Sequence, residues 1–127
     1  MKYLFRCWHE YGESVRPAKA GMIYDEKPGD CLLWKNKGQK VISVMQSINK
    51  KDINKRLIYE KDIVTGYAIQ GGPWKILFKG VIQWDYDECC YFVNNDDVTC
   101  CCWPYISFRF IKEIKVIGNI YEGEIYK

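Results

Sequence analysis

Alternation of apolar and polar side chains is the feature that most constrains the fold of this chain. Between residues 76 and 86 the even-numbered positions carry an apolar residue or glycine, whereas Lys79, Gln83 and Asp85 fall between them. A period of two residues is typical of a half-buried strand. The same period returns from residue 106 to 116, with a break near Ile111 and Lys112 that predicts a β-bulge or a bend.

The rest of the chain favours strands as well. No window of twelve or more residues shows the 3.6-residue period of an amphipathic helix, so we expect little helix. Turn-forming clusters occupy residues 25–30, 70–73 and 94–97. Between them lie short segments rich in branched and aromatic residues, which predict further strands at Tyr3 to Trp8, Cys31 to Trp34, Val41 to Met45 and Leu57 to Tyr67.

The length of 127 residues predicts one domain spanning 1–127. The first residues carry charges and lack the apolar core of a signal peptide, and no apolar run is long enough to span a bilayer. We therefore expect a cytoplasmic protein without membrane contact. Its seven cysteines are expected to stay reduced as small buried side chains.

The cysteines also raise the question of a metal site. A four-residue hairpin loop at 94–97 would set Val93 opposite Val98, and hence Cys90 opposite Cys101 and Cys89 opposite Cys102. Because neighbouring strand residues face opposite sides, these pairs cannot share one tetrahedral site. We predict no metal, although a different register would allow zinc to recruit further ligands from the set Cys7, Cys31 and His9.

Catalytic patterns are absent from the sequence. His9 is the one histidine, and no phosphate-binding or dinucleotide motif is present. The acidic pairs around Asp85, Asp87 and Glu88 fit solvated loops better than a catalytic dyad. We therefore predict a protein that is not an enzyme and needs no cofactor.

The formal net charge of +3 gives only weak support for nucleic-acid binding. Lysines nevertheless concentrate in one part of the chain, which defines a candidate basic patch: Lys35, Lys37, Lys40, Lys50, Lys51, Lys55 and Arg56. Nucleic acid is a possible partner of this patch but not the favoured one.

Two segments carry a family resemblance. Residues 44–64, VMQSINKKDINKRLIYEKDIV, and residues 115–123, KVIGNIYEG, resemble the conserved blocks of the YopX family of phage and prophage proteins. This chain departs from the family pattern at three glycines, which are replaced by Asn49, Lys55 and Lys61. Since lysine tolerates positive φ poorly, we expect the turns at Lys55 and Lys61 to differ in type from those of relatives.

The segment IYEKDIV resembles the opening of a small SH3-like barrel. We therefore expect a mainly β fold: a small SH3-like β-barrel core with extra N-terminal and C-terminal strands. The residues shared with the family define either a binding surface or internal tie points of the fold, and we favour tie points. They are Arg6, Trp8, Tyr59, Glu60, Asp62, Asn119, Tyr121 and Glu122.

The resemblance implies an accessory protein of a phage or prophage. We expect a non-catalytic binding protein that interferes with a process of the bacterial host, in host takeover or counter-defence. Its partner would be a host protein or a nucleotide-like signal that it sequesters. The alternative is a small barrel that binds single-stranded nucleic acid. In either case we expect a homo-oligomer, because small sheet proteins rich in aromatic rings tend to leave an apolar surface to cover.

Overall fold

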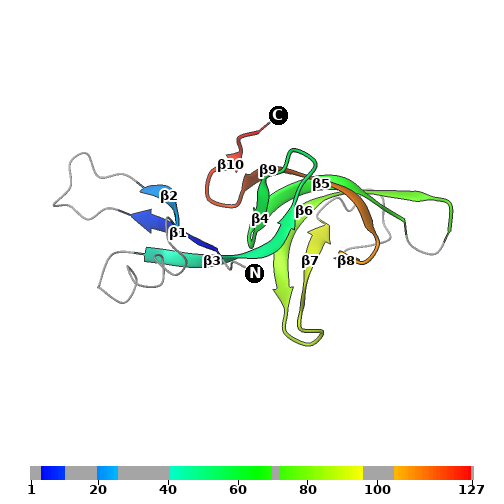
Figure 1. Ribbon diagram of the computed structural model, residues 1–127, viewed down its shortest axis with the longest axis horizontal. Helices are drawn as coiled ribbons and strands as arrows, with labels where there is room; N and C mark the ends of the chain where they lie inside the picture. Colours follow the sequence, from blue (N-terminus) through cyan, green and yellow to red (C-terminus); the bar gives the residue numbers. More distant parts are fainter. Residues whose placement is uncertain (1–3, 11–19, 26–40, 70–71, 96–104, 127) are drawn as a thin grey trace. The chain divides into compact units, whose positions relative to one another are not determined.

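The computed structural model describes residues 4–10, 20–25, 41–69, 72–95 and 105–126 (Figure 1). Every regular element in these ranges is a strand, so the prediction of a mainly β protein is confirmed. The strands are β1 (Phe5–Glu10), β2 (Ala20–Tyr24), β3 (Val41–Lys51), β4 (Leu57–Tyr59), β5 (Asp62–Ile69), β6 (Lys75–Asp85), β7 (Cys90–Asn95), β8 (Tyr105–Ser107), β9 (Ile111–Asn119) and β10 (Gly123–Glu124).

The chain divides into two compact units, Met1–Asn49 and Lys50–Lys127. In the first unit β1 is the middle strand, paired antiparallel with β2 on one side and with β3 on the other. The start of β1 is joined to the residue after β2, because the Asp25 carboxylate accepts a hydrogen bond from the Phe5 N–H at 3.0 Å. Strand β3 ends in the second unit, where β4 is hydrogen-bonded to it.

The second unit contains a six-stranded antiparallel sheet in the order β10-β9-β5-β6-β7-β8. Figure 1 shows β5, β6 and β9 strongly curved, so that the sheet forms an open half-barrel. The predicted alternation along β6 is confirmed, since Phe78, Gly80 and Ile82 are buried while Leu77, Lys79 and Gln83 are exposed. The concave side of the sheet holds an apolar core of Val64, Ala68, Phe78, Ile82, Val93, Ile106, Ile114 and Val116.

Glycine allows the strands to approach closely where the sheet bends. A Cβ atom built at Gly80 would collide with the carbonyl oxygen of Asn94 on β7. One built at Gly66 would collide with the carbonyl oxygen of Glu113 on β9. Glycine within a strand often marks such a bend or close approach, and here it permits the curvature of β5 and β6.

The sequence prediction was wrong at two strand boundaries. Leu57 to Tyr67 was expected as one strand, but a tight turn at residues 60 and 61 divides it into β4 and β5. The alternation from residue 106 was expected to run through Phe108 and Phe110, but β8 ends at Ser107 and a turn follows, in which the Phe110 N–H donates to the Ser107 carbonyl at 3.0 Å. The predicted bulge in β9 is confirmed, because Tyr67 pairs with Glu113 whereas Ala68 pairs with Ile111.

The hairpin register predicted for residues 94–97 was also wrong. Asn94 and Asn95 belong to β7, and Val93 pairs with Ile106 of β8 instead of with Val98. Asn94 and Asn95 therefore do not belong to a four-residue loop, because they continue the pairing of β7 with β6. Cys101, Cys102 and the predicted strand at Cys31 to Trp34 lie outside the described residues.

Three positions with positive φ coincide with the three departures from the family's glycines. Asn49, Lys55 and Lys61 have φ values of 59°, 63° and 67°. Both lysines adopt the left-handed conformation that glycine adopts readily. That their turns differ in type from those of relatives stays a prediction. The left-handed region costs a residue with a Cβ atom about 1–2 kcal/mol, so the surrounding hydrogen bonds must hold these turns.

Candidate functional site

A tight turn between β4 and β5 builds one wall of the candidate site. The Asp62 carboxylate accepts a hydrogen bond from the Tyr59 N–H at 2.8 Å and closes the turn. The Lys61 N–H donates to the Ile82 carbonyl at 2.8 Å, and the Lys61 carbonyl accepts from the Ile120 N–H at 3.1 Å. Glu60 and Lys61 are therefore fixed between β6 and the segment that follows β9.

A second turn lies directly opposite, because Asp62 pairs with Asn119 in the sheet. The Asn119 side-chain oxygen accepts the N–H groups of Tyr121 and Glu122 at 3.0 and 2.9 Å, while its amide donates to the Glu122 carboxylate at 3.0 Å. Lys61 Nζ donates to the Tyr121 hydroxyl at 3.4 Å and joins the two turns. Asp62 and Asn119 are both buried, which supports their interpretation as tie points.

These turns border an open groove of about 390 Å³. Hereafter "the groove" means the hollow lined by the following residues: Glu60, Lys61, Val81, Ile82, Gln83, Trp84, Tyr86 and Ile120. Tyr86 at its rim is 85% exposed and Ile120 is 48% exposed. The groove thus combines aromatic and aliphatic surface with one carboxylate and one ammonium group.

Trp84 is oriented by a neighbouring ring. The rings of Trp84 and Tyr91 meet edge to face, with centroids 4.8 Å apart and an interplanar angle of 68°. Burial, together with the charge of Glu60 and a hydrogen bond to it, raises the pKa of Tyr91 to about 12. Tyr91 therefore keeps its proton at neutral pH, and its hydroxyl donates a hydrogen bond to the Glu60 carboxylate, which orients that side chain at the groove.

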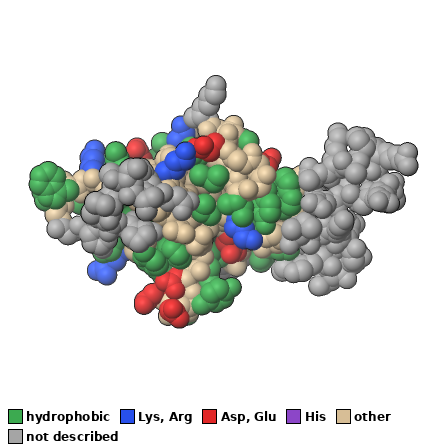
Figure 2. Space-filling model, turned by 180° about the vertical axis from the view of Figure 1, so that it is seen from behind, with side chains coloured by type: hydrophobic (Ala, Val, Ile, Leu, Met, Phe, Trp, Pro, Cys, Tyr) green, Lys and Arg blue, Asp and Glu red, His purple; other side chains and the backbone are tan. Residues whose placement is uncertain are grey.

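The hairpin between β6 and β7 carries Tyr86 at an acidic end of the second unit. The Asp85 carboxylate accepts the N–H groups of Asp87 and Glu88 at 2.9 and 3.3 Å and so shapes the turn. Figure 2 shows acidic and hydrophobic side chains gathered at this lower end. The expectation that Tyr86 continues the core face of the strand was wrong, because β6 ends at Asp85 and the turn directs Tyr86 outward.

A further cluster lies where β6, β7 and β8 meet. The Tyr105 ring stacks on Phe92, with centroids 4.2 Å apart, and its hydroxyl lies 3.6 Å from the Cys90 Sγ atom. A hydrogen bond from Tyr105 lowers the pKa of Asp85, and the contact with Cys90 is the main reason that the pKa of Tyr105 is raised. Cys90 thus forms a hydrogen bond with a tyrosine hydroxyl that stays protonated. This supports a role for Cys90 in holding β7 and β8 together.

The residues that the sequence grouped into one surface belong to both units. Arg6 and Trp8 lie on β1 in the first unit, where Arg6 is buried and Trp8 half-buried. The other six lie in the second unit around the two turns, and of these Glu60 lines the groove. The groove residues Trp84 and Ile120 were missed, because periodicity assigns Trp84 to the core and gives no signal for Ile120.

The predicted basic patch is described only in part. Lys35, Lys37 and Lys40 lie outside the described residues. Lys50 and Lys51 end β3, and Lys55 and Arg56 follow in the next turn, all four with exposed side chains. The Arg56 guanidinium lies over the ring of Tyr126, 3.6 Å from its centroid.

Metal clusters and membrane-spanning helices are both absent from the described residues. Within the ranges that the structure covers, no group of three or more histidine, cysteine or acidic side chains is placed to hold a metal ion. In the same ranges no helix has the length and hydropathy to cross a bilayer.

The fold and the groove define a small β protein with a curved, open sheet and an aromatic surface beside two hydrogen-bonded turns. The family model of the YopX protein matches residues 5–124, so the chain belongs to the YopX family. Membership indicates a phage or prophage protein. The comparisons with curated proteins and with solved structures gave no match.

Proposed function

We propose that this protein is a non-catalytic binding protein that holds a segment of a host protein in the groove and so interferes with a host process. The observation that carries the proposal is the exposure of Tyr86, 85%, beside the ordered ring of Trp84. Tryptophan and tyrosine are enriched among residues that dominate binding energy at protein interfaces. A cluster of such rings with a polar rim is typical of a binding surface.

The charges around the groove favour a protein segment over a nucleotide. Among the described residues that line it, Lys61 is the cation, and it donates to the Tyr121 hydroxyl. Glu60 and the acidic hairpin at Asp87 and Glu88 would repel phosphate groups. An apolar side chain of the partner fits against Trp84 and Ile120, and a neighbouring basic side chain complements Glu60.

The chemistry of the groove supports binding more than catalysis. Tyr91 retains its proton to about pH 12, and the Glu60 carboxylate is engaged by it. A general base needs a proton affinity matched to neutral pH and access to the reacting group. The two groups instead form a fixed hydrogen bond that shapes the wall of the groove.

Native mass spectrometry of the untagged protein, purified from phage-infected host cells, tests this proposal. We expect the mass of this chain, in one or more copies, plus that of a discrete host protein. Tyr86→Ala should reduce the retained partner about tenfold or more, as truncation of a central interface residue does. The matched control is Leu77→Ala, because Leu77 is also an exposed apolar residue of the same sheet, at 66%, but lies away from the groove.

Three outcomes would contradict the proposal. A nucleotide-sized adduct that disappears in Tyr86→Ala would identify the ligand as a small molecule. Equal loss of the partner in both variants would place the contact elsewhere on the sheet. A clean mass of the chain alone, from cells in which the phage is active, would show that the groove holds no stable partner.

A further inference from the structure

The convex face of the six-stranded sheet carries a row of cations contributed by distant parts of the chain. Thr65 of β5 pairs with Lys79 of β6 on one side and with Lys115 of β9 on the other. Directly opposed residues of antiparallel strands point to the same face, so the two lysines flank Thr65. Two strand spacings separate them, about 10 Å.

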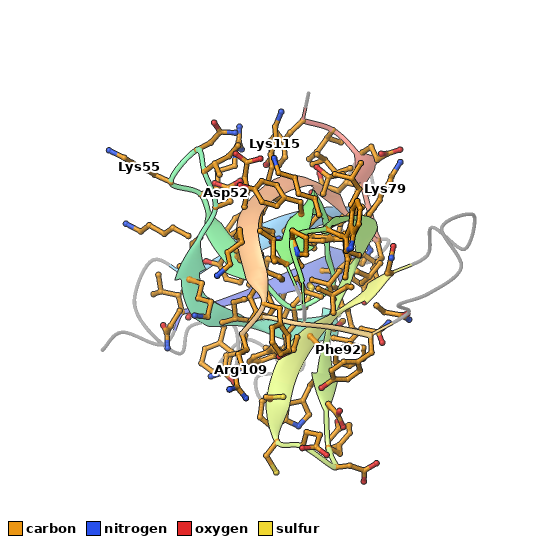
Figure 3. All side chains as sticks on the ribbon, turned by 90° about the vertical axis from the view of Figure 1, so that its right-hand side faces the viewer. Asp52, Lys55, Lys79, Phe92, Arg109 and Lys115 are labelled. Atoms are coloured by element: carbon orange, nitrogen blue, oxygen red, sulfur yellow. The ribbon has the colours of Figure 1, made fainter. Side chains whose placement is uncertain are left out.

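The turn after β3 carries two more cations, Lys55 and Arg56, and hydrogen bonds hold this turn against β9 beside Lys115. The Asp52 carboxylate accepts the Val116 N–H at 2.8 Å, and the Ile53 N–H donates to the Ile114 carbonyl at 3.0 Å. The turn therefore lies along β9 on both sides of Lys115. In Figure 3 Asp52, Lys55, Lys115 and Lys79 all lie in the upper half of the view, away from Phe92.

Aromatic rings accompany these cations. Lys75 Nζ lies 4.5 Å from the centroid of the Tyr67 ring, and Arg56 covers Tyr126. Trp74, which precedes Lys75, is 79% exposed. The basic track is defined as Lys55, Arg56, Lys75, Lys79 and Lys115. It combines positive charge with rings, the two features with which proteins bind the phosphates and bases of a single strand.

We infer that the basic track is a contact surface for single-stranded nucleic acid. The lysines and Arg56 contact phosphates, and Trp74 stacks on a base at the end of β6. Exposed Glu113 pairs with Tyr67 on the same face, but the five cations of the basic track outnumber it and Glu124, so the surface stays positive. This charge favours a phosphate-bearing partner, and the acids of the exposed hairpin, Asp87 and Glu88, lie at the other end of β6. Glu124 pairs with Lys79 at the surface, where both side chains are half-exposed. Such a pair is weak and gives way to a phosphate.

The basic track and the groove adjoin along β6 but share no residue, so this inference does not depend on the function proposed for the groove. Along β6, the basic track ends at Lys79 and the groove begins at Val81. A variant of the basic track therefore tests oligonucleotide binding alone, and a variant of the groove tests binding of the protein partner alone. Loss of oligonucleotide binding would leave the protein partner of Tyr86 untouched, and the reverse also holds.

The inference is tested by fluorescence anisotropy, which measures binding of labelled twelve-nucleotide oligothymidylate and oligouridylate from 50 to 300 mM salt. We expect the affinity to fall with salt, and each phosphate that the protein no longer neutralises should reduce the log–log slope by about 0.7. The Lys79→Gln/Lys115→Gln variant should therefore lower the slope by about 1.4. The charge-conserving control, Lys79→Arg/Lys115→Arg, should keep both slope and affinity.

Two further variants make the test specific. Trp74→Ala should weaken binding about tenfold if its ring stacks on a base, and its exposure means that the fold survives. Glu124→Gln should strengthen binding, because it removes a competitor for Lys79. The DNA and RNA arms identify the preferred sugar.

The inference is overturned if neither oligonucleotide binds at 50 mM salt, or if the glutamine and arginine variants bind alike. It is also overturned if salt and the glutamine variant change the self-association of the protein instead, measured by light scattering, since the partner would then be the acidic hairpin of a second copy.

Discussion

The Asp52 carboxylate accepts a hydrogen bond from the backbone N–H of Val116, 2.8 Å away and 64 residues further along the chain. Its other oxygen accepts the N–H groups of Asn54 and Arg56 at 2.9 and 2.8 Å. One buried side chain thus closes a turn and fastens it to β9. The acid that the family resemblance marks at this position therefore has a structural explanation.

Replacement of Asp52 by alanine should destabilise the second unit by about 2–4 kcal/mol, because three N–H groups lose a charged acceptor. Asp52→Asn should cost less, since its amide oxygen still accepts. Urea denaturation measures both changes. The control Asp87→Ala, at an exposed hairpin position, should change the free energy of unfolding by about 0.5 kcal/mol or less. Equal effects of the two alanine variants would contradict the structural role of the Asp52 carboxylate.

Replacement of Lys61 or Lys55 by glycine should stabilise the protein by about 0.5–1 kcal/mol. Glycine removes the cost of positive φ, and this gain exceeds the extra freedom that it gives the unfolded chain. Lys51→Gly, in an ordinary strand, should instead destabilise by a similar amount. Thermal denaturation of the three variants compares them. Destabilisation by all three would show that the lysine turns carry no strain.

Replacement of Gly80 by alanine should destabilise the protein by about 1–3 kcal/mol, because the added Cβ collides with the Asn94 carbonyl where β6 and β7 approach. Gly21→Ala is the control, since a Cβ atom there meets nothing within 4 Å. Chemical denaturation decides between them. A neutral Gly80→Ala would mean that the sheet relaxes without this close approach.

Tyr91 gives a pH dependence with a defined sign. Its pKa in the folded protein, about 12, lies above its ordinary value of about 10. The stability that this proton contributes is therefore present below about pH 10 and is lost as the pH rises towards 12. Glu60→Gln should lower the pKa of Tyr91, which tyrosinate absorbance at 295 nm records. Glu122→Gln, at the other turn, should leave it unchanged.

Much of the sheet could be predicted from local pattern. The alternation that fixes β6 and the bulge opposite Ala68 both follow from the order of side chains, since one face of the strand is buried. The register of β7 with β8 could not be predicted, because the asparagines at 94 and 95 suit a turn as well as a ladder. Pairing with β6, a non-local effect, decided between them.

The candidate site could likewise be predicted from the sequence only in part. Asp62 and Asn119 carry a recognisable side-chain pattern for closing turns, so their role as tie points was predicted. The groove depends on which side chain a turn directs outward, and Tyr86 sits one residue beyond the end of β6. The alternation of the sequence runs on through Tyr86, but the strand ends at Asp85, so periodicity alone placed this exposed ring on the same face as Phe78 and Ile82.

The most direct test of the groove as the binding site is site-specific photo-cross-linking in infected host cells, with the photoreactive residue placed at Tyr86, at Ile120 or at Leu77. We predict that positions 86 and 120, both at the groove, yield the same discrete host protein, whereas position 77 does not. Cross-links to one protein from position 77 alone, or the same products from all three positions, would contradict the assignment of the groove as the binding site.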